Sequence, residues 1–66
     1  MPFIQVTLME GRTIEQKHEL MRKLTQAVVD SLGSDAARVR VALYEVSTDE
    51  WAVGGEAMSV IQAKQQ

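Results

Sequence analysis

Apolar and polar residues alternate with a period of two along the first stretch of the chain, from Phe3 to Met9. Successive side chains of a strand point to opposite faces, so this period predicts a strand with one apolar face. The face directed toward a core holds Ile4, Val6 and Leu8, and the other face holds Phe3, Gln5, Thr7 and Met9. The alternation stops at Glu10-Gly11-Arg12, where the glycine permits a turn.

After this turn the apolar spacing becomes that of a helix. Thr13 followed three residues later by Gln16 fits a capping box, and Gly33 is a typical residue for a helix end. The face predicted to pack inward holds Ile14, Lys17, Leu20, Met21, Leu24, Ala27, Val28 and Leu32, and the opposite face is polar and charged. The pattern therefore predicts one long amphipathic helix.

A second alternating stretch begins at Val39, with Val41 and Leu43 on the same face, and predicts a second strand. Strand, helix and strand of these lengths form a βαβ unit, whose two strands are expected to be parallel. A polar turn at 47–50, a short extended piece at 51–53 and two glycines follow, and Val60 and Ile61 are expected to dock while the last residues fray. We therefore expect an α/β fold, a single domain over residues 1–66 made of a βαβ unit and a short C-terminal hairpin segment.

The small size of the chain predicts association. Sixty-six residues without a cysteine form a small core that no disulfide reinforces. One helix covers only one face of a two-stranded sheet, and parallel strands rarely leave a face in water. The second face is therefore expected to meet another subunit.

The charge and hydropathy of the chain exclude several partners. A net charge of −2 gives no basic surface for nucleic acid or an anionic membrane. No apolar run approaches the roughly 20 residues of a membrane span, and the N-terminus lacks a signal pattern, so a cytoplasmic location is expected. No metal-ligand spacing or nucleophilic pair is visible, and no cofactor is expected.

A proline directly after the initiator methionine has a structural and a chemical interpretation. Pro2 cannot donate to a sheet ladder and is tolerated at the first residue of a strand. Initiator methionine is generally removed before a small residue such as proline, which would leave Pro2 as a free secondary amine. Such an amine is a base that no internal residue supplies.

The other candidate residues are individually weak. Arg12 is typical of a solvated loop, and Trp51, the single tryptophan, is typical of packing. Arg38 and Arg40 lie two apart on the predicted strand, so both are expected on the same face, where charge at an edge discourages aggregation.

Together these elements are specific. Pro2, then Glu10-Gly11-Arg12-Thr13, then Val39-Arg40-Val41 and Trp51-Ala52-Val53-Gly54-Gly55-Glu56 resemble the 4-oxalocrotonate tautomerase family from Pro2 to about Met58. The resemblance implies a homohexamer built from dimers, with active sites shared between subunits. It implies that Pro2 shuttles a proton on a small enol or keto carboxylic acid such as 2-hydroxymuconate. It further implies that Arg12 binds one carboxylate, that Arg40 binds the other carboxylate and the carbonyl oxygen, and that Trp51 forms the pocket wall.

Residue chemistry agrees with these implied roles. An α-amino group titrates near 8, and burial beside guanidinium groups disfavours the ammonium form, so the pKa of Pro2 is expected to be lowered toward the working pH of a base. Bidentate arginines hold carboxylates and stabilise the charge that develops on an enolate oxygen.

Three residues depart from the family pattern. Trp51 replaces a smaller phenylalanine, and Met9 replaces a leucine at the end of the first strand, where it is expected to line the substrate site. Arg38 adds a cation that is expected to share or compete with the role of Arg40.

Two alternative functions stay open. Dehalogenases and hydratases of the same superfamily carry a glutamate two residues beyond the aromatic residue, and this chain has Val53 there. The other alternative is a non-catalytic oligomeric module, for which Pro2 and Arg12 would be dispensable.

Overall fold

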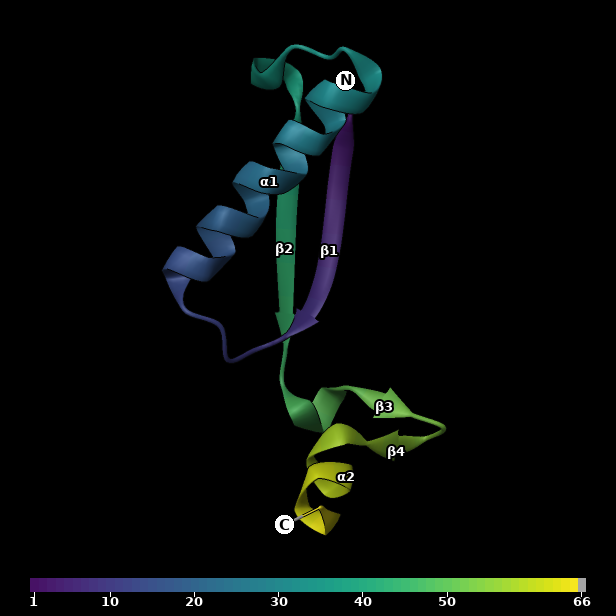
Figure 1. Cartoon of the computed structure of the whole chain (residues 1–66). Coiled ribbons are helices and arrows are strands. Elements are labelled where there is room, and N and C mark those ends of the chain that lie inside the picture. The colour runs from purple at the N-terminus through teal and green to yellow at the C-terminus, as the bar shows by residue number, and fades with distance from the viewer. Residues whose placement is uncertain (66) are drawn as a thin grey trace.

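The computed structural model describes residues 1–65 and contains the predicted βαβ unit. Strand β1 (Phe3–Met9) leads into helix α1 (Ile14–Leu32), a short 3-10 turn η1 (Ala36–Arg38) and strand β2 (Arg40–Val46). The two strands pair in parallel, with Phe3 opposite Arg40 and Met9 opposite Val46. The parallel pairing confirms the predicted arrangement, and Figure 1 shows α1 running across the strand pair.

Helix α1 begins and ends where the sequence predicts. Thr13 accepts a hydrogen bond from the Gln16 backbone N–H at 3.1 Å, and the Gln16 side chain accepts one from the Thr13 N–H at 3.0 Å. At the other end, Gly33 adopts a left-handed conformation with φ 68°, and its N–H donates to the Val29 carbonyl. This conformation is open to glycine at little cost and ends the helix.

The helix covers one face of the sheet. Ile4, Val6 and Leu8 are half-buried, as the alternation predicts, and Lys17 of α1 reaches Glu45 of β2 in a 2.8 Å ion pair. The two ends of the helix extend past the packed region, because Ile14 and Leu32 are 59% and 70% exposed. Their predicted inward position is therefore wrong within a single protomer.

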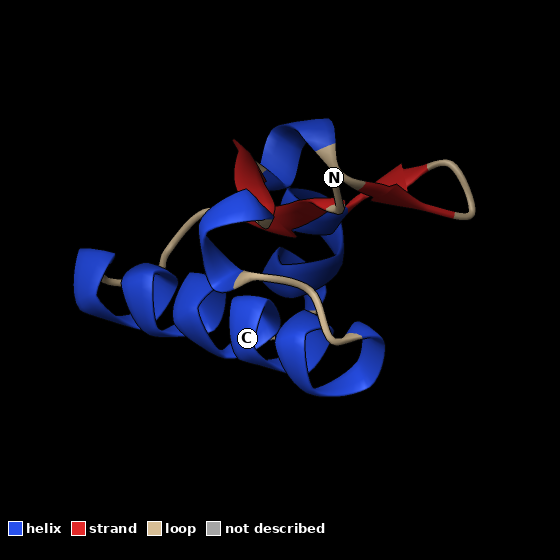
Figure 2. Ribbon diagram, turned by 90° about the horizontal axis from the view of Figure 1, so that it is seen from above, coloured by secondary structure: helices blue, strands red, loops and turns tan. Residues whose placement is uncertain are grey.

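The other face of the sheet is open. Its exposed residues include Phe3, Gln5, Thr7, Arg40 and Tyr44. Seen from above, α1 lies to one side of the strands and the C-terminal hairpin extends sideways (Figure 2). Val39, 9% exposed, is the one buried hydrophobic residue among residues 1–65.

The protomer is more extended than a compact monomer of the same size. Its accessible surface is 4965 Å², against about 4,200 Å² expected for a compact monomer of this mass. Its radius of gyration is 15.4 Å, against about 11 Å for a compact chain of this length. The protomer therefore leaves exposed a part of the surface that a compact chain of this length would bury.

The C-terminal segment forms a small unit beyond the end of β2. After the 3-10 turn η2 (Thr48–Glu50), strands β3 (Ala52–Val53) and β4 (Glu56–Ala57) form the predicted hairpin. Gly54 and Gly55 supply its two positive φ angles, 62° and 86°.

A short helix α2 (Met58–Lys64) ends the described chain. The expectation of a frayed end is therefore wrong as far as Lys64. The Ser59 hydroxyl donates to Asp49 at 2.6 Å, and Lys64 pairs with Glu56 at 2.8 Å. These contacts hold a helix that is too short to be stable alone. Within residues 1–65, no helix has the length and apolarity needed to cross a membrane.

Candidate active site

Pro2 lies at the entrance of β1, where its missing N–H costs the sheet nothing. Its carbonyl accepts the Arg40 backbone N–H at 3.0 Å, which joins the start of β1 to the start of β2. The residue is half-buried and lines a cavity of about 410 Å³. Met1 is attached here, so the Pro2 nitrogen is an amide, and Met1 itself is 83% exposed.

Arg40 occupies the first position of β2, beside Pro2. Its side chain is exposed, and one guanidinium nitrogen donates to the Ala37 carbonyl at 2.8 Å. Backbone and side chain thus both hold Arg40 at the end of the sheet where Pro2 lies.

Arg38 does not lie on the strand. The Asp35 side chain accepts the Ala37 N–H at 3.1 Å and starts the 3-10 turn η1, which closes when the Arg38 N–H donates to the Asp35 carbonyl. The prediction that Arg38 and Arg40 share a strand face is therefore wrong, because this capped turn delays the strand until Arg40. Arg38 instead lines the cavity at Pro2.

Arg12 and Met9 lie at the opposite end of β1. Gly11, with φ 127°, makes the turn that leads away from the strand. The Arg12 guanidinium approaches the Met9 carbonyl at 3.5 Å and is exposed. In Figure 1 this loop lies at the end of the strand pair opposite to the N-terminus.

Trp51 follows η2, beyond the C-terminal end of β2. It is half-buried, and its carbonyl accepts the Met58 N–H at 2.6 Å. Val53, two residues on, is 56% exposed and offers no carboxylate.

The protomer therefore brings together only part of the expected site. Pro2, Arg38 and Arg40 gather at one end of the sheet, whereas Arg12, Met9 and Trp51 follow the ends of the strands on the other side. Parallel pairing places the starts of both strands together and their ends together, which separates the two groups by the strand length. One site containing both groups requires more than one copy of the chain.

Three residues that line the cavity beside Pro2 are not predicted as site residues by the sequence pattern: Gly33, Ser34 and Asp35. They follow the last turn of α1, and only the return of the helix to the start of β1 brings them near Pro2. No local signal in the sequence indicates this.

Within residues 1–65, no group of three His, Cys, Asp or Glu side chains is placed to hold a metal ion. The pKa of Glu19 is lowered by its hydrogen bond from Arg22, and that pair lies exposed on α1, away from both groups.

Comparison with known proteins gives consistent matches. The family model described as tautomerase enzyme matches residues 2–61. The 2-hydroxymuconate tautomerase of Comamonas testosteroni is 40% identical over 55 residues, which cover 83% of this chain and 87% of that protein.

Two solved structures share the fold. TomN, a 4-oxalocrotonate tautomerase homologue in the tomaymycin biosynthetic pathway, superposes with a TM-score of 0.95 at 35% identity and covers 98% of this chain and 100% of its own. A heterohexamer 4-oxalocrotonate tautomerase from Chloroflexus aurantiacus gives a TM-score of 0.86 at 39% identity, covering 89% and 95%.

Proposed function

This chain belongs to the tautomerase family of isomerases, and we propose that it converts 2-hydroxymuconate-type enol dicarboxylates to their conjugated 2-oxo isomers. The observation that carries the proposal is the position of Pro2, half-buried at a cavity beside two arginines. The relative from Comamonas testosteroni, whose name gives 2-hydroxymuconate as its substrate, supports this substrate class.

The proposed reaction is a proton transfer through the Pro2 nitrogen once Met1 has been removed. The uncharged amine takes the proton of the 2-hydroxyl group, and the oxygen electron pair forms the 2-oxo double bond. The carbon double bonds shift by one position, and the prolinium returns its proton to C5 of the substrate. No atom is gained or lost, and the amine is regenerated.

Removing Met1 would have a second effect. Met1 lines the same cavity as Pro2, so its loss also clears space in front of the nitrogen. A proton carrier must come within hydrogen-bond reach of the atoms it serves, and this space provides the access.

The arginines and the tryptophan are assigned to binding. Arg40, next to Pro2, holds the carboxylate and oxygen at the enol end, where a guanidinium stabilises the negative charge that develops on oxygen. Arg12 binds the distant carboxylate, and Trp51 with Met9 provides apolar walls that exclude water and strengthen these interactions.

Assembly completes the site in this proposal. Pro2 and Arg12 come from opposite ends of β1, so the Arg12 that acts on a given Pro2 belongs to another protomer. The open sheet face and the extended shape support self-association, and the hexameric relative from Chloroflexus aurantiacus supports six subunits. We propose a homohexamer for this chain.

The hydratase alternative has less support. That chemistry needs a carboxylate to activate water two residues after the aromatic residue, and Val53 stands there. The nearest downstream acid, Glu56, is paired with Lys64 at 2.8 Å.

The test is a spectrophotometric assay of 2-hydroxymuconate conversion by the wild type and Pro2→Ala. We expect Pro2→Ala to lose at least about tenfold in turnover, because a flexible primary amine replaces the rigid secondary one. Arg22→Ala, on the exposed surface of α1, is the matched control and is expected to keep full activity.

Size-exclusion chromatography accompanies the assay. Pro2→Ala is expected to keep the oligomer of the wild type. Full turnover by Pro2→Ala would contradict the proposal, as would a loss explained entirely by disassembly. An inactive wild type with a free Pro2 amine would favour the non-catalytic module.

A further inference from the structure

The cavity at Pro2 has a second wall that the mechanism above does not use. Gly33, Ser34, Asp35 and Arg38 face Met1 and Pro2 across a space of about 410 Å³. This wall is the connection between α1 and β2, and two local devices shape it. The left-handed Gly33 ends the helix, and the Asp35 cap closes the 3-10 turn that presents Arg38.

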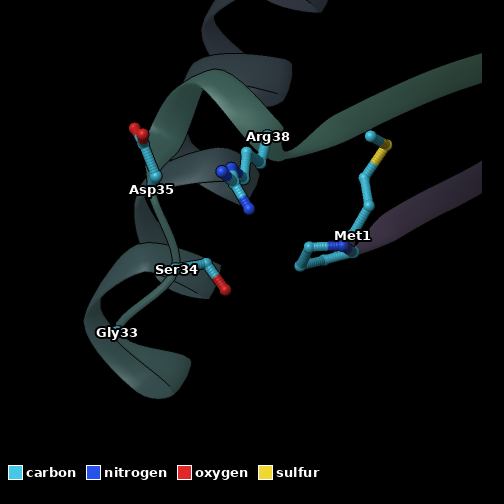
Figure 3. A pocket seen from close by; sticks show the side chains of 6 residues that line it. Met1, Gly33, Ser34, Asp35 and Arg38 are labelled. Atoms are coloured by element: carbon cyan, nitrogen blue, oxygen red, sulfur yellow. The ribbon is translucent and has the colours of Figure 1, made fainter.

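The side chains of this wall differ in direction. In Figure 3 the Arg38 guanidinium and the Ser34 hydroxyl point toward the space in front of Met1, whereas the Asp35 carboxylate points away from it. Asp35 accepts the Ala37 N–H at 3.1 Å, which accounts for its orientation. The wall therefore presents a cation and a hydroxyl donor to the cavity.

Arg38, rather than Arg40, is the cation that faces this cavity. Within residues 1–65, no side chain forms an ion pair or hydrogen bond with the Arg38 guanidinium. Arg40 donates to the Ala37 carbonyl and does not line the cavity. An exposed guanidinium directed into the cavity that Pro2 lines is suited to bind an anionic group of the substrate.

We propose that Arg38, in the same protomer that supplies Pro2, shares with Arg40 the binding of the substrate carboxylate adjacent to the enol. This inference rests on the proposed proton transfer, because the proline can take the enol proton only when the enol oxygen lies at its nitrogen. The carboxylate on the neighbouring carbon is then held in the same cavity. A guanidinium fork matches the paired oxygens of a 2-hydroxy or 2-oxo acid.

The inference predicts different losses for two kinds of substrate. Arg38 would contact the carboxylate beside the enol, whereas the second carboxylate would contact Arg12 of another protomer. A substrate that lacks the second carboxylate therefore keeps the contact with Arg38 and loses the contact with Arg12.

The experiment compares two substrates, 2-hydroxymuconate and the monocarboxylate 2-hydroxypenta-2,4-dienoate. We expect Arg38→Gln to raise KM about 10- to 100-fold on both, the effect of losing a hydrogen bond to a charged group. Arg38→Lys, which keeps the charge without the fork, is expected to recover part of this loss. Arg12→Gln is expected to impair only the dicarboxylate, and Arg22→Gln, the exposed control, neither substrate.

Three results would overturn the inference. If Arg38→Gln keeps the KM of the wild type on both substrates, the Arg38 side chain does not bind the substrate. A loss confined to the dicarboxylate would place Arg38 at the other carboxylate. A fall in kcat alone, or a change of oligomeric state, would indicate a structural role.

A binding measurement separates this inference from the proposed function. Isothermal titration calorimetry of the mature protein with 2-oxopentanoate measures the Kd of this ligand and needs no turnover. Binding that weakens at least about tenfold in Arg38→Gln supports the Arg38 site even if neither enol is converted. Binding unchanged in Arg38→Gln refutes it even if the enzyme is an active tautomerase.

Discussion

The separation of Pro2 and Arg12 along β1 leads to a quantitative prediction about mixed assemblies. Strand β1 has seven residues, and a rise of about 3.3 Å per residue separates the Cα atoms of Phe3 and Met9 by about 20 Å. Arg12 lies beyond Met9 and its side chain approaches the Met9 carbonyl, so it stays at that end. Within one protomer the two side chains therefore cannot contact one small substrate.

Two inactive variants should then restore activity when they assemble together. Pro2→Gln removes the proline and, because glutamine is large, leaves Met1 attached. Arg12→Ala removes the carboxylate contact at the other end. In a symmetric assembly of the two chains at equal amounts, about a quarter of the sites combine an intact Pro2 with an intact Arg12 from another protomer.

The assay mixes the two variants in denaturant, refolds them together and follows 2-hydroxymuconate conversion. We expect about 25% of wild-type activity per site after correction for the activity of each variant alone. The control mixes the already folded oligomers without denaturant. This mixture should regain less activity, because subunits exchange slowly between folded oligomers.

The refuting result is the absence of any gain in the refolded mixture, when chromatography shows that mixed oligomers formed. Such a result would mean that Pro2 and Arg12 act within one protomer, or that Arg12 is not part of the site.

Three further predictions concern the stability and the pH dependence of the protein. Gly33→Ala should lower the free energy of unfolding by about 1 kcal/mol, because alanine is strained at φ 68°. Gly33→Asn should lower the free energy of unfolding by less than Gly33→Ala in the same thermal melts. Equal melting temperatures of the wild type and both variants would contradict this prediction. A double-mutant cycle of Lys17→Met and Glu45→Gln should give a coupling free energy of about 0.5 kcal/mol, since the side chains are 24% and 31% exposed. A coupling of zero in urea unfolding would show that this ion pair does not stabilise the fold. The value of kcat/KM should rise with pH through the pKa of the mature Pro2 amine, because only the uncharged amine accepts a proton. The guanidinium groups of Arg38 and Arg40 near Pro2 disfavour the protonated amine, and a value of kcat/KM that falls with rising pH would contradict this account.

The βαβ unit could be predicted from the sequence because its signals are local. Alternation over Phe3–Met9 and the capping box at Thr13 each act within a few residues, and the structure confirms both. The exposed ends of α1, at Ile14 and Leu32, could not be predicted from periodicity, since the extent of the sheet decides where helix packing stops.

The errors have identifiable causes. Arg38 was assigned to a strand from its spacing to Arg40, but the Asp35 side chain caps a turn that competes with the strand. Helix α2 was missed because its seven residues depend on contacts outside the helix, such as that of Ser59 with Asp49.

The site was predictable only in part. Pro2, Arg12, Arg40 and Trp51 were identified together through a resemblance, and no one of them is distinctive alone. The cavity wall at Ser34 and Arg38 depends on the helix returning its C-terminal end to the start of β1, which is a property of the fold.

The central claim is that a free Pro2 amine carries the proton, and a comparison of two synthetic chains tests it most directly. Residues 2–66 and residues 1–66 would be synthesised, refolded, checked for equal oligomer size and assayed with 2-hydroxymuconate. We predict that the chain beginning at Pro2 is active and that the chain retaining Met1 is at least about 100-fold slower, the effect of losing a general base. Equal activity of the two chains would contradict the claim, because the Pro2 nitrogen of the longer chain is an amide.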